Sequence, residues 1–123
     1  MTINEFQKLI ERLYYSKDNK RGIEGTFMWF AEEVGELSRA LRKVNPEDKK
    51  SIKHLEEEFA DCFAWLSTLA SLSGIKLDKT IEKYKNGCPK CNKKPCICKE
   101  KRIKLNIKNQ KPKTHTKKRK NNG

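Results

Sequence analysis

Hydrophobic side chains recur at the spacing of an α-helix along most of the first 87 residues. A first amphipathic pattern covers residues 3–14, with Thr2 or Asn4 available as its N-cap. The polar, glycine-containing stretch 16–25 is expected to be a loop, and a second helical pattern runs from about residue 26 to 44. The chain thus opens with two predicted helices joined by a loop.

A proline separates the second pattern from the third. Asn45-Pro46 interrupts the second helix, and Pro46 suits the first turn of a helix that continues to about residue 73, where Gly74 is a natural C-cap. A shorter pattern over 76–85 predicts a fourth helix. No run alternates with a period of two for long enough to predict a sheet. The pattern therefore predicts an all-α fold, an antiparallel helical bundle.

Charge divides the chain near residue 87. Residues 1–87 hold 15 Lys or Arg and 15 Asp or Glu, whereas residues 88–123 hold 14 and one, so the net charge of +13 belongs to the last third. The mean hydropathy of -0.93 is low for a compact globule. We therefore predict a helical domain over 1–87, a cysteine-rich segment over 88–98 and a disordered basic tail over 99–123.

The sequence also bears on location. No apolar run is long enough to cross a bilayer, and the charged, amphipathic N-terminus is unlike a secretory signal. The expected location is the cytoplasm. In a reducing compartment, the five cysteines are better interpreted as thiols or metal ligands than as disulfides.

Two acidic motifs occupy matching positions on consecutive predicted helices, EEVGE over 32–36 and EEFAD over 57–61. At about 100° per residue, Glu33 and Glu36 share one flank of the apolar stripe of the second helix. Glu58 and Asp61 take the same two positions beside the stripe of the third helix. The stripes consist of Phe30, Val34, Leu37 and Leu41 on the second helix and Leu55, Phe59, Cys62, Leu66 and Leu69 on the third.

If the two helices pack through their stripes, four carboxylates face one groove. Close carboxylates either raise one another's pKa or are held ionised by cations, and Mg²⁺ and Mn²⁺ are hard cations that prefer oxygen ligands. Magnesium shares its coordination positions with substrate phosphates, so such a cluster indicates phosphate-ester or phosphoanhydride chemistry. The alternative interpretation is an ordinary solvated helix face.

These paired motifs on a short all-α chain resemble the MazG-like nucleotide pyrophosphohydrolases. The likeness covers roughly residues 1–98 and includes Trp29 before the first motif and, more loosely, the KYKNGCPKC segment seen in some archaeal-type members. It implies Mg²⁺-dependent hydrolysis of a ribo- or deoxyribonucleoside triphosphate between the α and β phosphates, which gives a monophosphate and pyrophosphate. It also implies that subunits complete the helical bundle by dimerisation, as a homodimer or homotetramer.

The resemblance assigns roles to individual acids. The implied Mg²⁺ ligands are Glu33, Glu36, Glu58 and Asp61. Glu32 and Glu57 are implied as further ligands or as catalytic bases that orient water. The basic tail has no counterpart in the minimal family pattern, which leaves the physiological substrate open.

Three residues are candidates for contact with the substrate. Trp29 can stack on a base, although an aromatic residue beside an apolar stripe more often packs in the core. Lys83, with Asn86 nearby, can contact phosphates, although a solvated lysine is the commoner case.

The cysteine-rich segment CPKCNKKPCIC carries a CxxC followed, after four residues, by a CxC. Four thiolates within reach of one tetrahedral Zn²⁺ predict a closed structural site. The alternative is a set of free, oxidisable thiols. The predicted ligands are Cys88, Cys91, Cys96 and Cys98.

The basic tail leads to a rival function. From Lys99 onward the chain carries eleven Lys or Arg and one acid, a polycation that can contact nucleic acid without sequence preference. The rival is a zinc-knuckle nucleic-acid-binding protein whose helical domain only dimerises. Salt-sensitive binding of RNA or DNA, without Mg²⁺-dependent release of pyrophosphate, would favour it.

Overall fold

The computed structural model describes residues 1–100, which form two long helices followed by two short ones. Their bounds are α1 Ile3–Lys43, α2 Lys49–Leu72, α3 Leu77–Thr80 and the 3₁₀ helix η1 Ile81–Tyr84. No strand occurs among these residues, so the predicted all-α class is confirmed. None of the helices within this range is both long and apolar enough to span a bilayer. From residue 101 onward, the predicted basic tail lies outside the described residues.

The start of α1 and the end of α2 lie where the sequence predicts them. Thr2 is the N-cap of α1, because its Oγ1 accepts a hydrogen bond from the N–H of Glu5 at 3.1 Å. Gly74 follows α2 with a φ of 69°, the left-handed conformation that a glycine at a helix C-terminus commonly adopts.

The third predicted helix starts later than Pro46. It begins at Lys49, because the Asp48 carboxylate caps it by accepting a hydrogen bond from the N–H of Lys50 at 3.0 Å. The preceding turn is held by Asn45, whose Oδ1 accepts from the N–H of Glu47 at 3.1 Å. The proline therefore lies in the turn and not in the first turn of the helix.

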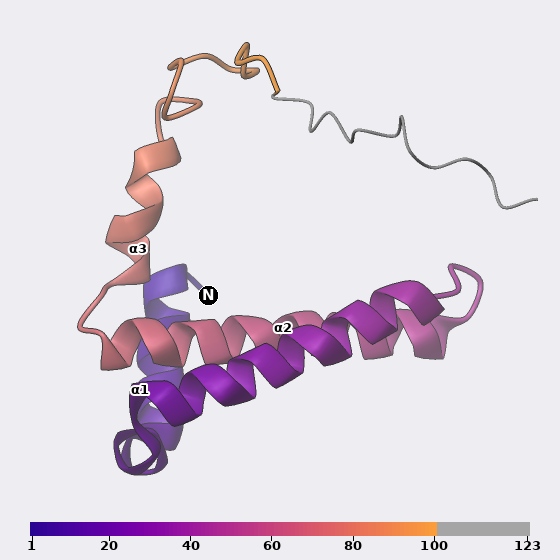
Figure 1. Ribbon diagram of the computed structural model, residues 1–123, viewed down its shortest axis with the longest axis vertical. Helices are drawn as coiled ribbons and strands as arrows, with labels where there is room; N and C mark the ends of the chain where they lie inside the picture. The colour runs from indigo at the N-terminus through magenta and orange to yellow at the C-terminus, as the bar shows by residue number, and fades with distance from the viewer. Residues whose placement is uncertain (101–123) are drawn as a thin grey trace, which may run out of the picture.

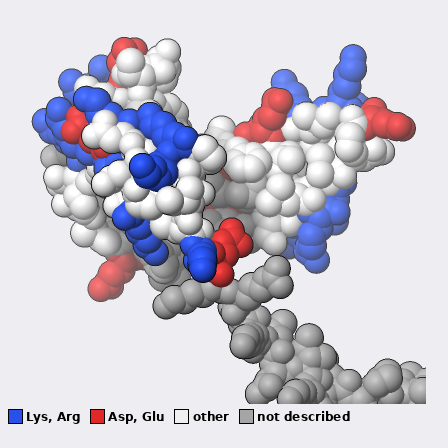
Figure 2. Space-filling view, turned by 90° about the horizontal axis from the view of Figure 1, so that it is seen from above, with Lys and Arg blue, Asp and Glu red and all other residues white. Residues whose placement is uncertain are grey.

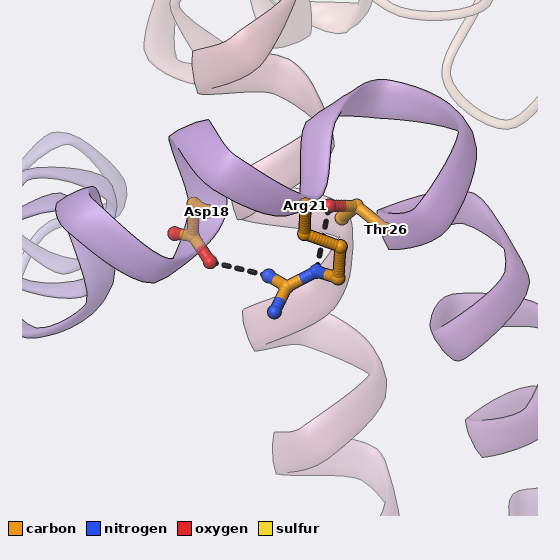
Figure 3. A network of polar contacts seen from close by, with 3 residues as sticks. All are labelled: Asp18, Arg21 and Thr26. Carbon is orange, nitrogen blue, oxygen red and sulfur yellow. Dashed lines mark hydrogen bonds and ion pairs between the residues drawn. The ribbon is translucent and has the colours of Figure 1, made fainter.

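The prediction of a loop over 16–25 is wrong. The helix continues through this stretch, and the break is confined to Gly22, whose φ of 75° and ψ of -179° are accessible to glycine. The polar side chains that suggested a loop find partners instead. Arg21 pairs with the buried Asp18, and its Nε–H donates to Thr26 Oγ1 at 3.0 Å (Figure 3). A bend at one residue thus takes the place of a loop.

The bend gives α1 two arms, a first arm over 3–21 and a second arm over 23–43. Figure 1 shows the second arm alongside α2 in the antiparallel direction, while the first arm crosses α2 near its C-terminal end. A buried glutamine holds this crossing: Gln7 Nε2 donates to Ser71 Oγ at 3.1 Å and to the carbonyl of Ile75 at 2.8 Å. The first arm is therefore fixed against the end of α2.

The apolar stripes are partly exposed in the single chain. Their exposed fractions are 43% for Val34, 49% for Leu41, 53% for Phe59 and 42% for Leu66. Among residues 1–100 the buried hydrophobic side chains are Ile10, Ala40 and Ala70. Figure 2 shows uncharged surface at the end of the α1–α2 pair that lies away from the first arm, between scattered acidic and basic side chains. The stripes therefore do not form a closed core within one chain.

Candidate metal centre between the two long helices

The second arm of α1 and the helix α2 bring three carboxylates together. Glu33, Glu58 and Asp61 each offer an oxygen, and these oxygens all lie within 4.8 Å of one another. Glu58 and Asp61 are three residues apart on α2, a spacing that puts both side chains on one face. We call these three residues the acidic cluster. It contains three of the four predicted magnesium ligands.

Glu58 is the most enclosed member of the acidic cluster. Its exposed fraction is 8%, and its Oε2 is buried without a hydrogen-bond partner among the described residues. Its Oε1 lies 3.7 Å from Nε2 of the largely exposed His54. A buried carboxylate oxygen without a donor is costly unless a proton or a cation satisfies it. Oxygen donors of this kind fit a hard cation such as Mg²⁺.

The pKa of the Glu33 carboxyl is raised by its surroundings. Burial raises the pKa of its carboxyl, and the nearby charges of Asp61, Glu58, Glu36 and Glu32 raise it further, in that order. Desolvation and repulsion both disfavour the ionised form. A divalent cation at this place would offset both effects, because it would be the largest local charge.

The other predicted acids lie at the margin of the acidic cluster. The Glu36 side chain is 43% exposed and lies 3.7 Å from Arg39 Nη1, so it has a partner of its own. Glu32 and Glu57 are exposed. Of these two, only Glu32 is among the causes of the raised pKa of Glu33. The packing thus separates an inner group of three carboxylates from an outer group.

A cavity of about 290 Å³ lies beside the acidic cluster, and Asp61 belongs to both. The cations Lys17 and Arg21 and the ring of Trp65 also line it. Its volume is close to the lower end of small-molecule sites, about 300 Å³. The sequence did not predict Lys17 and Arg21 as site residues, because the stretch 16–25 was expected to be a loop. The available signal was the i, i+3 spacing of an acid and an arginine at 18 and 21, which is typical of a helix.

Arg21 lies between a polar network and an aromatic surface. Its Cζ is 4.6 Å from the ring centroid of Trp65, a cation–π contact, and Trp65 stacks on Trp29 with 6.1 Å between centroids. A guanidinium has about five N–H donors. In Figure 3 one terminal nitrogen of Arg21 points away from both Asp18 and Thr26. Arg21 therefore keeps donors for a further anionic partner.

The remaining candidates for substrate contact lie elsewhere. Trp29 is half exposed beside the cavity-lining Trp65. Lys83 is exposed on η1, with its Nζ 5.0 Å from the ring centroid of Tyr84, and Asn86 is exposed beyond η1. Neither Lys83 nor Asn86 lines the cavity beside the acidic cluster.

The four predicted zinc ligands also meet, at a second place. The sulfurs of Cys88, Cys91, Cys96 and Cys98 all lie within 4.8 Å of one another, and we call this group the cysteine cluster. The pKa of the Cys88 thiol is lowered to about 6, first by the backbone N–H of Cys91 and then by that of Lys90. Side-chain contacts with Cys96, Cys91 and Cys88 raise the pKa of Cys98 to about 12. The thiols therefore do not all ionise together unless a cation is present.

The fifth cysteine is separate from this group. Cys62 is half-buried on α2, and burial raises the pKa of its thiol, which the charges of the acidic cluster raise further. A thiol with a raised pKa stays protonated and unreactive near neutral pH.

The comparisons with known proteins decide the family. Residues 21–92, more than half of the chain, match the MazG nucleotide pyrophosphohydrolase domain. The chain belongs to the MazG nucleotide pyrophosphohydrolase family. The MazG match begins beside the bend of α1 and includes both acidic motifs, but it ends before Cys96 and is narrower than the likeness expected over 1–98. No curated protein and no solved structure matches the chain.

Proposed function

We propose that the protein hydrolyses ribo- or deoxyribonucleoside triphosphates between the α and β phosphates, giving a nucleoside monophosphate and pyrophosphate, and that it requires Mg²⁺ or Mn²⁺. The observation that carries the proposal is the position of Asp61, where the acidic cluster meets the cavity. This residue belongs to the acidic cluster and also lines a cavity that contains Lys17 and Arg21. Carboxylates that can hold a metal ion thus adjoin basic side chains that can bind phosphates, in a chain of the MazG family.

The residues present fit a magnesium ion. Glu33, Glu58 and Asp61 would hold it, and Glu36 is the neighbouring acid that would complete the set. Their oxygens are the donors that Mg²⁺ prefers, and the buried Oε2 of Glu58 has no other partner within the described residues. When bound, Mg²⁺ neutralises phosphate charge and favours deprotonation of the attacking water.

The cavity residues bind and orient the triphosphate. Asp18 and Thr26 fix Arg21 by an ion pair and a hydrogen bond, so little freedom is lost when the planar guanidinium donates to a phosphate. Lys17 adds a second positive charge at the same cavity. The stacked pair Trp29–Trp65 offers an aromatic surface on which a base of any kind can lie.

An exposed acid beside the acidic cluster orients the attacking water. Glu32 is the first choice, because it precedes Glu33 on α1 and its charge contributes to the raised pKa of that carboxyl. Glu57 is the second choice, since it precedes Glu58 on α2 but is not among the causes of that shift. Either would accept a proton as a general base.

The test is pyrophosphate release by the full chain with Mg²⁺, measured over a panel of ribo-, deoxyribo- and modified nucleoside triphosphates. Asp61→Asn and Glu36→Gln should each lower the rate by more than about 100-fold. Mutation of a residue that only supports a metal ligand already lowers activity or metal affinity by about 10- to 100-fold. The helical circular dichroism of both variants should equal that of the wild type.

The matched control is Glu56→Gln, an exposed acid on the same helix that lies outside both groups of carboxylates. It should keep the wild-type rate. Full activity of Asp61→Asn would refute the role of the acidic cluster. Salt-sensitive binding of RNA or DNA by a wild-type protein that releases no pyrophosphate would instead favour the zinc-knuckle rival.

We also infer that the protein acts as a homodimer or homotetramer. The half-exposed stripes on α1 and α2 support this, since a second copy can bury Leu41 and Phe59 that one chain leaves in solvent. A helical bundle completed by a second copy would also stiffen the two helices that carry the acidic cluster.

Sedimentation equilibrium should give at least twice the chain mass of 14.4 kDa. Leu41→Glu should shift the protein toward the mass of one chain, because a charge inside an apolar interface has no partner. Ile81→Glu is the control, since Ile81 is comparably exposed but lies on η1. A wild-type protein with the mass of one chain would contradict the inference.

A further inference from the structure

The cysteine-rich segment follows η1 at the end of α3 that lies away from the α1–α2 pair (Figure 1). It contains four of the five cysteines of the chain. The match to the MazG domain ends at residue 92, so Cys96 and Cys98 lie beyond it. The catalytic proposal uses none of these thiols, and the segment requires an explanation of its own.

The spacing of the four sulfurs fits a tetrahedral metal site. Cys88 Sγ lies 3.8 Å from Cys98 Sγ, and Cys91 Sγ lies 3.9 Å from Cys96 Sγ. Zn–S bonds of about 2.3 Å place the sulfurs of a tetrahedral site about 3.8 Å apart. Four ionised thiolates this close together would carry four negative charges, which a cation at the centre would offset. The two pairs therefore describe opposite edges of a site for one ion.

The loop is built so that the four sulfurs converge. The N–H of Asn92 donates to the carbonyl of Cys88 at 2.7 Å, and the N–H of Cys88 donates to the carbonyl of Lys93 at 3.1 Å. Gly87, with a φ of 110°, allows this closure, because a Cβ there would lie 2.9 Å from the carbonyl oxygen of Lys93. The N–H of Cys98 points at Cys96 Sγ at 3.3 Å, a contact that favours a thiolate.

The charge of the segment complements a thiolate site. Four thiolates and one Zn²⁺ leave a net charge of about -2. The segment itself supplies lysines next to the ligands, at Lys90, Lys93 and Lys94, and Lys94 Nζ also donates to the carbonyl of Lys85 at 3.3 Å. That last bond ties the loop to the end of η1. A bound ion would therefore fix the whole segment relative to the helices.

We propose that Cys88, Cys91, Cys96 and Cys98 bind one Zn²⁺ in a closed tetrahedral site that fixes the segment 88–98 and takes no part in hydrolysis. Four protein ligands leave no coordination position for a substrate or a water. Thiolates select zinc over magnesium, so this site and the acidic cluster take different ions. The proposal goes beyond the proposed function and does not depend on it.

The test is the metal content of the full chain, purified under reducing conditions without chelator and measured by mass spectrometry of the elements. We expect about one zinc per chain. Cys96→Ser should lower zinc at least about tenfold, whereas Cys62→Ser, the matched control on α2, should keep it. Circular dichroism shows whether each variant keeps its helices.

A second pair of variants tests the loop without removing a ligand. Gly87→Ala should weaken zinc binding by about tenfold or more, because a positive φ costs a non-glycine residue about 1–3 kcal/mol. Gly74→Ala is the control, since Gly74 also has a positive φ but lies outside the loop, and nothing lies within 4 Å of a Cβ added there. Zinc affinity is read from competition with a chromophoric chelator.

Three results would overturn the proposal. The first is wild-type zinc no higher than that of Cys96→Ser. The second is iron in place of zinc, which is visible as a coloured thiolate complex. The third is a chain mass lower by about four hydrogens in protein purified without reductant or chelator, which would show two disulfides in place of a metal site. Each is measured without a nucleotide, so a failed pyrophosphate assay leaves this test intact.

Discussion

The acidic cluster and the cysteine cluster are both groups of potential metal ligands, but the chain assembles them in different ways. Glu33 comes from α1, and Glu58 and Asp61 come from α2, so their oxygens meet only when the two helices pack in one phase. The four thiols come from one short segment and meet through hydrogen bonds within it. One site therefore depends on tertiary packing, and the other on local loop closure.

The donors differ as well. Carboxylate oxygens prefer hard cations that keep water and phosphate oxygens as further ligands, whereas thiolates prefer soft or borderline ions such as zinc. The acidic cluster adjoins a cavity, but the four cysteines would surround their ion completely. On the two proposals above, this difference in donors would direct a hard ion to the acidic cluster and zinc to the cysteine cluster.

Removal of metal gives the largest effect and tests this separation directly. Protein stripped of all divalent ions should release no measurable pyrophosphate, because the carboxylates of the acidic cluster then repel the triphosphate. Mg²⁺ alone should restore the rate while the cysteines stay accessible to a thiol reagent. Zinc alone, at about one equivalent per chain, should protect the thiols and restore no hydrolysis.

The control for this experiment is Cys96→Ser, which should respond to Mg²⁺ as the wild type does. If Mg²⁺ restores activity only after zinc is present, the two sites are coupled. The cysteine cluster would then position the helices, and the contrast between a local and a tertiary site would be wrong.

Some of the candidate site could be predicted from the sequence because it depends on helical periodicity alone. Glu58 and Asp61 share a helix face by their spacing of three, and the same spacing on the preceding helix marks Glu33 and Glu36. The cysteine cluster was predictable for a similar reason, since a loop of eleven residues limits how far its thiols can separate. The convergence of Glu33 with the acids of α2 needed the structure, which also placed Glu36 beside Arg39.

The cavity could not be predicted, because it depends on the bend at Gly22. A polar stretch with two glycines is typical of a loop, but Asp18, Arg21 and Thr26 satisfy one another and keep the helix. The bend then turns the first arm across α2, which brings Lys17 and Arg21 to Asp61. Such a contact between distant segments leaves no periodic signal.

The apolar stripes show a second limit of sequence reasoning. Periodicity identifies positions such as Val34 and Phe59 as apolar faces, but it does not say which surface covers them. Within one chain both stay about half exposed. The pattern also did not predict the buried Gln7, whose side chain joins the first arm to the end of α2 by hydrogen bonds.

A smaller effect is expected at the bend itself. Gly22→Ala should lower the free energy of unfolding by about 1–3 kcal/mol, because a φ near 75° with an extended ψ is essentially restricted to glycine. A clash is not the cause, since nothing lies within 4 Å of an added Cβ. Urea unfolding at one fixed protein concentration, followed by circular dichroism, measures the change.

Gly35→Ala is the matched control for the bend. Gly35 lies in the second arm with helical backbone and equally open space, so alanine should raise the free energy of unfolding by about 0.5–1 kcal/mol. Because the bend brings Arg21 to the cavity, Gly22→Ala should also lower pyrophosphate release, yet it should leave zinc binding unchanged. Equal changes in pyrophosphate release in the two alanine variants would mean that the bend does not determine the geometry of the cavity that Lys17 and Arg21 line. A loss of zinc in Gly22→Ala would mean that the cysteine cluster depends on the helices after all.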